Sequence, residues 1–171
     1  LMRALIAGCL FGAEIYVPYL LIDGYGFSPT WAGLGLTAAA LLWALGADLQ
    51  GRFGDRLGNT RIALIGVTLL SSATAIAAVT AALHLPPAVV IAGWALAGGG
   101  MGLMYPRLTV LTLAYSTPRN QGFNSSALSI ADSVGAAASI AVLGLTFVAL
   151  TATDAGFPAV FAIATGLALL A

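Results

Sequence analysis

Two long apolar runs are separated at residues 51–61 by the stretch GRFGDRLGNTR. This stretch holds four formal charges, in a chain of 171 residues that has only six basic and six acidic residues in total. Hydrophobic residues make up 60% of the sequence and charged residues 7%, whereas a soluble domain carries about 25% charged residues. We therefore expect an integral membrane protein in which residues 51–61 form a polar turn at the bilayer surface.

Clusters of turn-forming residues divide the chain into six apolar segments. The expected spans are approximately residues 3–22, 30–50, 61–83, 88–115, 122–150 and 157–171. At a rise of ~1.5 Å per residue, all but the last are long enough to cross the hydrocarbon core. We expect an all-α, polytopic membrane protein, with residues 1–171 forming a single six-helix bundle. Because the chain begins and ends almost inside a span, we also expect it to be a fragment of a protein of roughly 12–14 helices.

The basic residues predict the orientation of the bundle, because cytoplasmic loops carry an excess of arginine and lysine. With six alternating spans, the turns at 51–61 and 116–121 lie on the same side as the N-terminus. That side holds Arg3, Arg52, Arg56, Arg61 and Arg119, and the opposite turns hold Asp23, His84 and Asp154. We therefore expect both chain ends to be cytoplasmic.

Several classes of function are not supported by the composition. The net charge is zero, so we expect no nucleic-acid partner. Cys9 is the only cysteine and His84 the only histidine, which excludes a thiolate metal site and leaves no clustered ligands or catalytic base for an intramembrane enzyme. The string AGGGMG at 97–102 lacks the spacing of a phosphate-binding loop and predicts close helix packing. We expect neither an enzyme nor a bound metal or cofactor.

Charged residues inside membrane spans are costly, and they are therefore candidates for function. Arg107 and Asp132 flank the 116–121 turn at similar distances, so we expect an ion pair between the fourth and fifth spans. This pair is either a static link or one that breaks during a working cycle. Asp132 also belongs to a stripe of small and polar residues that is expected to face protein or water, namely Ser125, Ser129, Asp132, Gly135 and Ser139.

Glu14 lies past the middle of the first span, near Tyr16 and Tyr19. Desolvation disfavours the charged carboxylate, so Glu14 is expected either to exchange a proton between two conformations or to stay hydrated in an aqueous vestibule. In the fourth span, Pro106 removes a backbone hydrogen bond and is expected to kink the helix beside Arg107.

The stretch at 51–61 resembles the signature loop of the major facilitator superfamily, G-x-L-A-D-R-x-G-R-[RK]. Gly51, Asp55, Arg56 and Gly58 match this pattern, while Asn59 and Thr60 stand where basic residues are usual. We expect both glycines to permit a tight reversal. The resemblance implies a conformational latch, in which Asp55 meets a helix end that belongs to another part of the protein. The expected latch residues are Gly51, Arg52, Asp55, Arg56, Gly58 and Arg61.

Two further stretches extend the resemblance along the chain. GWALAGGGMGLMYPRLTV and STPRNQGFNSSALSIADSVGAAAS are similar to the fourth and fifth spans of the C-terminal half of such transporters, of the multidrug-efflux, drug:H⁺ antiporter type. The resemblance implies a carrier of two six-helix halves with a substrate site between them near the bilayer midplane. By that pattern, the candidate substrate and coupling residues are Glu14, Tyr16, Tyr19 and Arg107, and Asp132 is a candidate for gating.

The resemblance implies proton-coupled secondary transport, with export of hydrophobic or amphipathic compounds by alternating access. Lipid or nutrient transport by the same fold and a non-transporting membrane scaffold are the alternatives. The expected partners are the N-terminal six-helix half of the same polypeptide, the lipid bilayer and a small substrate. The driving force is expected to be a proton gradient, and the expected location is the plasma membrane, in a bacterium the inner membrane.

Overall fold

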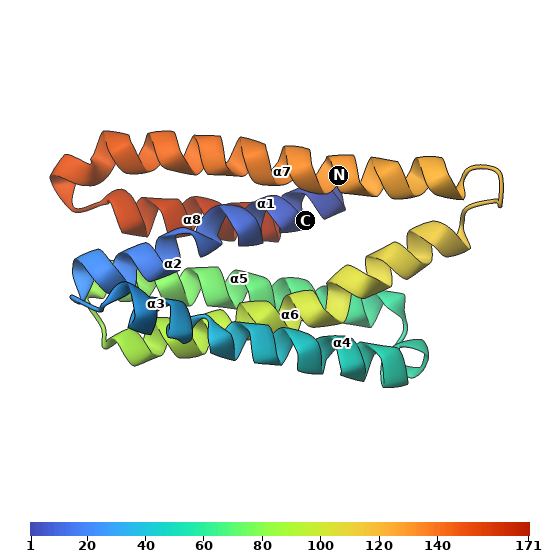
Figure 1. The fold of residues 1–171 in the computed structure, drawn as a ribbon, viewed down its shortest axis with the longest axis horizontal. Coiled ribbons are helices and arrows are strands. Elements are labelled where there is room, and N and C mark those ends of the chain that lie inside the picture. The colour runs from blue at the N-terminus through green and yellow to red at the C-terminus, as the bar shows by residue number, and fades with distance from the viewer.

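The computed structural model describes all 171 residues, and its regular structure is entirely helical (Figure 1). The first membrane segment comprises α1 (Met2–Glu14), α2 (Tyr16–Tyr19) and a π-helical turn, η1 (Leu20–Gly24). The remaining elements are α3 (Pro29–Gly35), α4 (Thr37–Leu57), α5 (Asn59–Leu83), α6 (Pro87–Ala114), α7 (Gln121–Leu150), the 3₁₀ turn η2 (Thr151–Thr153) and α8 (Gly156–Leu169). Five segments are long and apolar enough to cross a membrane, and α8 is a shorter apolar helix. The predicted all-α bundle is confirmed.

The helices form two groups of three. In Figure 1, α4, α5 and α6 lie together below, and α1, α7 and α8 lie together above. Within the groups, α4 and α5 both pack on α6, and α1 packs on α7 and α8, while α5 and α8 pack together between the groups. Span one (α1) therefore packs on span five (α7) in the same way as span four (α6) packs on span two (α4). Such a pattern is expected when the last three spans repeat the first three.

Local sequence explains where the helices begin and end. The Ser28 side chain accepts a hydrogen bond from the backbone N–H of Trp31, with Pro29 as the first residue of α3. Pro87 likewise begins α6. At the other ends, His84 terminates α5 and Asp154 follows η2, both in the left-handed conformation.

The glycine-rich stretch of α6 lets three helices approach closely. Gly98 and Gly102 face the backbone of α4, at Ala39 and Trp43, while Gly100 faces α5. A Cβ atom at Gly100 would lie 2.6 Å from the carbonyl oxygen of Gly66, so a side chain does not fit there. The prediction that AGGGMG serves helix packing is confirmed.

The turn at residues 51–61 is shorter than the sequence predicts. Helix α4 continues past residue 50 to Leu57, and the chain reverses at Gly58, whose φ is 81°. Gly51 lies inside the helix, so the expectation that both glycines form the turn is wrong for this residue. The helix continues because polar side chains at its emerging end are solvated and can pair along it, as Arg52 does with Asp48.

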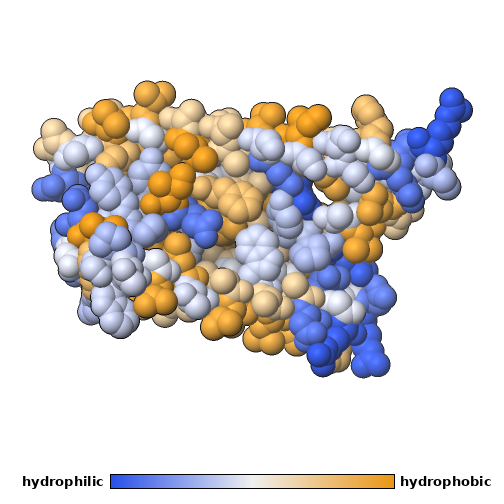
Figure 2. All heavy atoms as spheres, in the orientation of Figure 1, coloured by the Kyte–Doolittle hydropathy of each residue, from blue (hydrophilic) through white to orange (hydrophobic).

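Helix α6 contains Pro106 in its interior, and its last turns incline away from α4 and towards the start of α7 (Figure 1). Figure 2 shows hydrophilic residues gathered at the end of the bundle that carries the 51–61 and 116–120 turns, and apolar residues along its flanks. Such a distribution suits a bundle with its flanks in lipid and its turns in water.

Candidate functional site

A network of polar side chains joins α1, α6 and α7 inside the membrane-spanning part. Arg3 binds the Asp132 carboxylate through two hydrogen bonds, from Nε at 2.7 Å and from Nη2 at 3.0 Å. Its Nη1 donates to the Tyr105 carbonyl oxygen at 3.0 Å and to Thr109 Oγ1 at 2.8 Å. The Tyr105 hydroxyl donates to Asp132 at 2.6 Å, and the Arg3 guanidinium lies 3.5 Å from the centre of the Tyr105 ring. Each charged group in the network is therefore multiply satisfied.

The predicted ion pair between Arg107 and Asp132 is wrong. Asp132 pairs with Arg3 instead, a residue that the sequence placed among the charges at the membrane surface. Sequence spacing along a hairpin sets the depth of a residue but not the direction in which its side chain points. The true partner lies 129 positions away on another helix, where no local spacing could reveal it.

Arg107 belongs to a second polar cluster, at the 51–61 end of the bundle. Its Nη1 donates to Asp55 at 2.8 Å and its Nε to Asn59 at 2.7 Å, so it connects α6 to the junction of α4 and α5. The Arg107 side chain is 15% exposed and that of Asp55 94%. The sequence predicts a partner for Asp55 outside this six-helix unit, but the structure gives it a partner within the chain.

The other charged residues of the 51–61 motif are more loosely held. Arg52 pairs with Asp48 one turn earlier on α4, and both side chains are largely exposed. Arg56 and Arg61 are exposed and form no ion pair. Exposed pairs of this kind contribute about 0–1 kcal/mol. Arg107 of α6, whose side chain is 15% exposed, is the one largely buried charged side chain that contacts the motif.

Glu14 lies at the end of α1 and lines a cavity of about 410 Å³ between α1, α3, α4 and α6. Aromatic and apolar side chains form much of the wall, including Leu10, Leu36, Trp43 and Trp94. The Glu14 carboxyl group has no hydrogen-bond or ion-pair partner, whereas Asp48, Asp55 and Asp132 each pair with an arginine. It is the one charged group in the wall of this cavity.

A family model described as Major Facilitator Superfamily matches residues 1–171, the whole chain. The chain belongs to the major facilitator superfamily. No curated protein matches it significantly. Proteins of this superfamily are secondary transporters that cross the membrane several times and are not enzymes. The match agrees with the six-helix bundle and with the position of the 51–61 motif after the second span.

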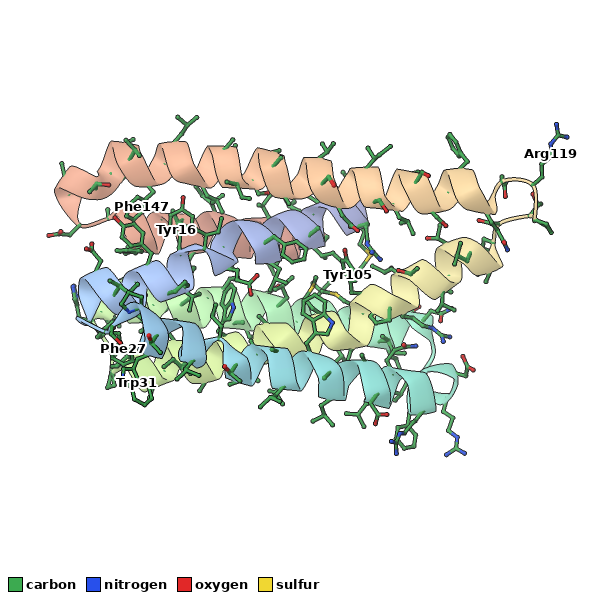
Figure 3. The ribbon with its side chains drawn as sticks, in the orientation of Figure 1. Tyr16, Phe27, Trp31, Tyr105, Arg119 and Phe147 are labelled. Carbon is green, nitrogen blue, oxygen red and sulfur yellow. The ribbon has the colours of Figure 1, made fainter.

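Two of the predicted site residues of this major facilitator protein lie away from the Glu14 cavity. Tyr16 is buried and Tyr19 half-exposed, and both rings pack against Phe147 of α7 with centroid distances of 5.3 Å. Figure 3 shows Tyr16 and Phe147 side by side. Tyr19 also contacts Phe157, 5.4 Å away at the start of α8. The structure therefore places both tyrosines where α2 packs against α7 and the start of α8.

The small and polar stripe on α7 divides into two parts. Asp132, Gly135 and Ser139 contact α1, where Gly135 lies against the Ala4 carbonyl and Ser139 against Gly8. The other two members, Ser125 and Ser129, are exposed near the start of α7.

Sequence reasoning missed the aromatic residues Trp43, Trp94 and Tyr105. Their signal is weak, because an aromatic residue in an apolar span more often packs in the core than lines a site. Tyr105 had one distinguishing feature, its position directly before Pro106 and Arg107 in the fourth span. No three His, Cys, Asp or Glu residues lie close enough together to bind a metal ion.

Proposed function

We propose that this major facilitator protein is a proton-coupled exporter of hydrophobic or amphipathic compounds, which are neutral or cationic. The observation that carries the proposal is the unpaired Glu14 carboxyl group in an aromatic-lined cavity. An isolated carboxyl group in apolar surroundings favours its neutral form, and it becomes ionised when water or a cation reaches it. The same group can therefore bind either a proton or a cationic substrate.

The lining of the cavity supports this substrate class over an anionic nutrient. Trp43 is partly exposed in the wall, and an indole ring attracts a cation that lies over its face. Trp94 is buried and contributes apolar wall behind it. No arginine lines the cavity, because Arg3 is held by Asp132 and Arg107 by Asp55. An anion would therefore meet Glu14 without a compensating positive charge.

In the proposed cycle, a cationic or amphipathic compound enters from the cytoplasm while Glu14 is ionised. After the cavity opens to the outside, a proton binds to the Glu14 carboxylate and the substrate leaves. The protonated carrier returns, and Glu14 releases the proton into the cytoplasm, which completes one exchange. The ligand and the proton drive the change only because each favours a different conformation.

This cycle requires further parts that we also propose. The chain forms the C-terminal half of a two-half carrier in a bacterial inner membrane, with a second six-helix half of the same polypeptide completing the cavity. The turns at 51–61 and 116–121 lie in the cytoplasm, because the exposed arginines are there. The Arg107–Asp55 contact holds that end of α6 to α4 and α5, and its exposed carboxylate makes the contact inexpensive to break.

The test reconstitutes the full-length protein in liposomes and measures uptake of a lipophilic cation driven by an imposed pH gradient. Wild type is expected to accumulate the cation, and Glu14→Gln to lose the response to the gradient. The matched control is Asp154→Asn, which removes a carboxylate from the turn before α8. Residue 154 has a left-handed backbone, a conformation that asparagine tolerates well. Gradient-driven uptake by Glu14→Gln equal to that of wild type would refute Glu14 as the coupling residue.

A further inference from the structure

The buried Arg3 network is connected to the Glu14 cavity through Tyr105. The ring of Tyr105 has the Arg3 guanidinium 3.5 Å from its centre and the Trp43 ring at a centroid distance of 5.8 Å, inclined at 62°. Trp43 lines the cavity. Tyr105 projects from α6 into the space between the two groups of helices (Figure 3). Contacts therefore run without interruption from Asp132 through Arg3 and Tyr105 to the wall of the cavity.

Helix α1 provides a second connection. Arg3, Leu10 and Glu14 are separated by seven and four residues. At 3.6 residues per turn, Leu10 and Glu14 lie about 20° to either side of Arg3 around the helix, so all three share one face of about 40°. The face that Arg3 anchors is therefore the face that carries Leu10 and Glu14 into the cavity. A rotation of α1 about its axis would move Arg3 away from Asp132 and turn Glu14 away from the cavity together.

We propose that Arg3, Tyr105 and Asp132 are positioning residues for the cavity. They fix the rotation of α1 about its axis and thereby the direction of the Glu14 side chain. Tyr105 also packs against Trp43 and holds this ring in the wall of the cavity. The inference rests on the proposed function, because it assigns the network a role in the site where the substrate and the proton bind. It also implies that the Arg3–Asp132 pair is a static link that persists through the transport cycle, and not a pair that breaks during it.

The geometry favours a persistent pair for two reasons. The contact is bidentate, and the side chains of Arg3 and Asp132 are only 11% and 18% exposed. Separating them would leave two charges in an apolar environment. The side chain that moved would also give up a second hydrogen bond, from Arg3 to Thr109 or from Tyr105 to Asp132. The Arg107–Asp55 pair, with its exposed carboxylate, meets neither condition.

The test removes the network without leaving a buried charge. In Arg3→Met/Tyr105→Phe/Asp132→Leu, apolar side chains replace the ion pair, and the Tyr105 ring stays against Trp43. Such replacements are often neutral or stabilising, and in some proteins they reduce conformational specificity. We expect a folded protein with a maximal transport rate near that of wild type and an apparent KM for the lipophilic cation about tenfold higher, equal to ~1.4 kcal/mol. Single Asp132→Asn, which leaves Arg3 unpaired, is expected to reduce folded yield.

A labelling experiment reports the position of α1 without requiring transport. Glu14→Cys and Ala13→Cys are each made in full-length Cys9→Ala protein, and a small hydrophilic maleimide is added. With the network intact, the cysteine at 14 reacts and the one at 13 does not, because Ala13 is completely buried. In the triple variant, the difference in maleimide reactivity between the cysteines at 13 and 14 is expected to become smaller.

The outcomes separate this inference from the proposed function. An unchanged KM and an unchanged labelling difference in a folded triple variant would overturn the positioning role. The positioning role would also be overturned if the triple variant lost its response to the pH gradient but kept the difference in labelling. Asp132 would then be a coupling residue. If wild type shows no gradient-driven uptake at all, the proposed function fails, while the labelling comparison still decides whether the network orients α1.

Discussion

Replacing Gly46 by alanine is expected to destabilise the bundle by a steric conflict that the structure defines. Gly46 lies on α4 where this helix meets α6. A Cβ atom at this position would lie 2.6 Å from the Gly99 carbonyl oxygen, 3.1 Å from the Leu103 nitrogen and 3.2 Å from the Gly102 carbonyl carbon. Ordinary contact begins at 3.4 Å, so the shortest distance falls short by 3.4 − 2.6 = 0.8 Å. Because all three atoms are backbone, no side chain can rotate away and the helices must separate.

The matched control is Gly99→Ala, in the same pair of helices. There the nearest atoms, Leu42 Cβ and the Leu42 carbonyl oxygen, lie 3.9 and 4.0 Å from the new Cβ, which is ordinary contact. Both substitutions gain the preference of alanine over glycine for helix, about 0.8–1 kcal/mol. The difference between the two variants therefore isolates the overpacking cost, which is typically about 1–3 kcal/mol.

The assay is thermal unfolding of the purified protein in detergent, followed by the fraction that remains monodisperse after heating. We expect the midpoint for Gly46→Ala to lie below that for Gly99→Ala by about 2–4 °C for each kcal/mol. Equal midpoints, or a more stable Gly46→Ala, would show that α4 and α6 are not as close as the structure places them.

Three further predictions concern the ends of the bundle. Tyr25→Phe is expected to cost about 1 kcal/mol, because the Tyr25 hydroxyl donates to a main-chain carbonyl in the turn before α6. Burial raises the pKa of Tyr25 above its ordinary value of 10.0. The folded state therefore keeps the hydroxyl proton to a higher pH than the unfolded state, and stability falls as the pH rises past about 10. Thermal unfolding of wild type and Tyr25→Phe across this pH range checks the prediction, because the variant lacks this loss. Arg107→Gln is expected to lower stability by about 1 kcal/mol or less, since the Asp55 carboxylate that it leaves is solvated; a much larger loss in thermal unfolding would contradict this. Gly58→Ala is expected to cost about 1–3 kcal/mol because φ is 81° there, whereas Gly51→Ala, in open space inside a helix, is expected to cost nothing in the same assay.

The six segments could be predicted from the sequence because the bilayer limits the choices. Each span must satisfy its own backbone and cover about 30 Å, so apolar length and turn residues are sufficient signals. The sequence did not predict that α4 continues to Leu57, because apolar length is a signal only within the membrane. Beyond residue 50 the chain is solvated, and a helix with Asp48 and Arg52 one turn apart continues without an apolar pattern.

The candidate site was predictable only in part, because its contacts join distant segments. Glu14, Arg107 and Asp132 were found as charges in apolar spans, which is a property of single residues. Their partners were not found, since pairing depends on which face each helix turns to its neighbours. Tyr105 could not be distinguished from a core aromatic until Arg3 and Trp43 were seen on either side of its ring.

By itself, the sequence determined the membrane setting, the six-helix class and the resemblance of the 51–61 motif to a transporter superfamily, because composition, length and local spacing are properties of contiguous residues. Only the tertiary structure decided that Arg3 holds Asp132, that Arg107 holds Asp55, and that Glu14 is left unpaired in a cavity. The physical reason is that side-chain direction follows from the rotation and packing of whole helices. A charge within a span therefore finds its partner in space, on whichever helix the glycine-lined contacts bring beside it.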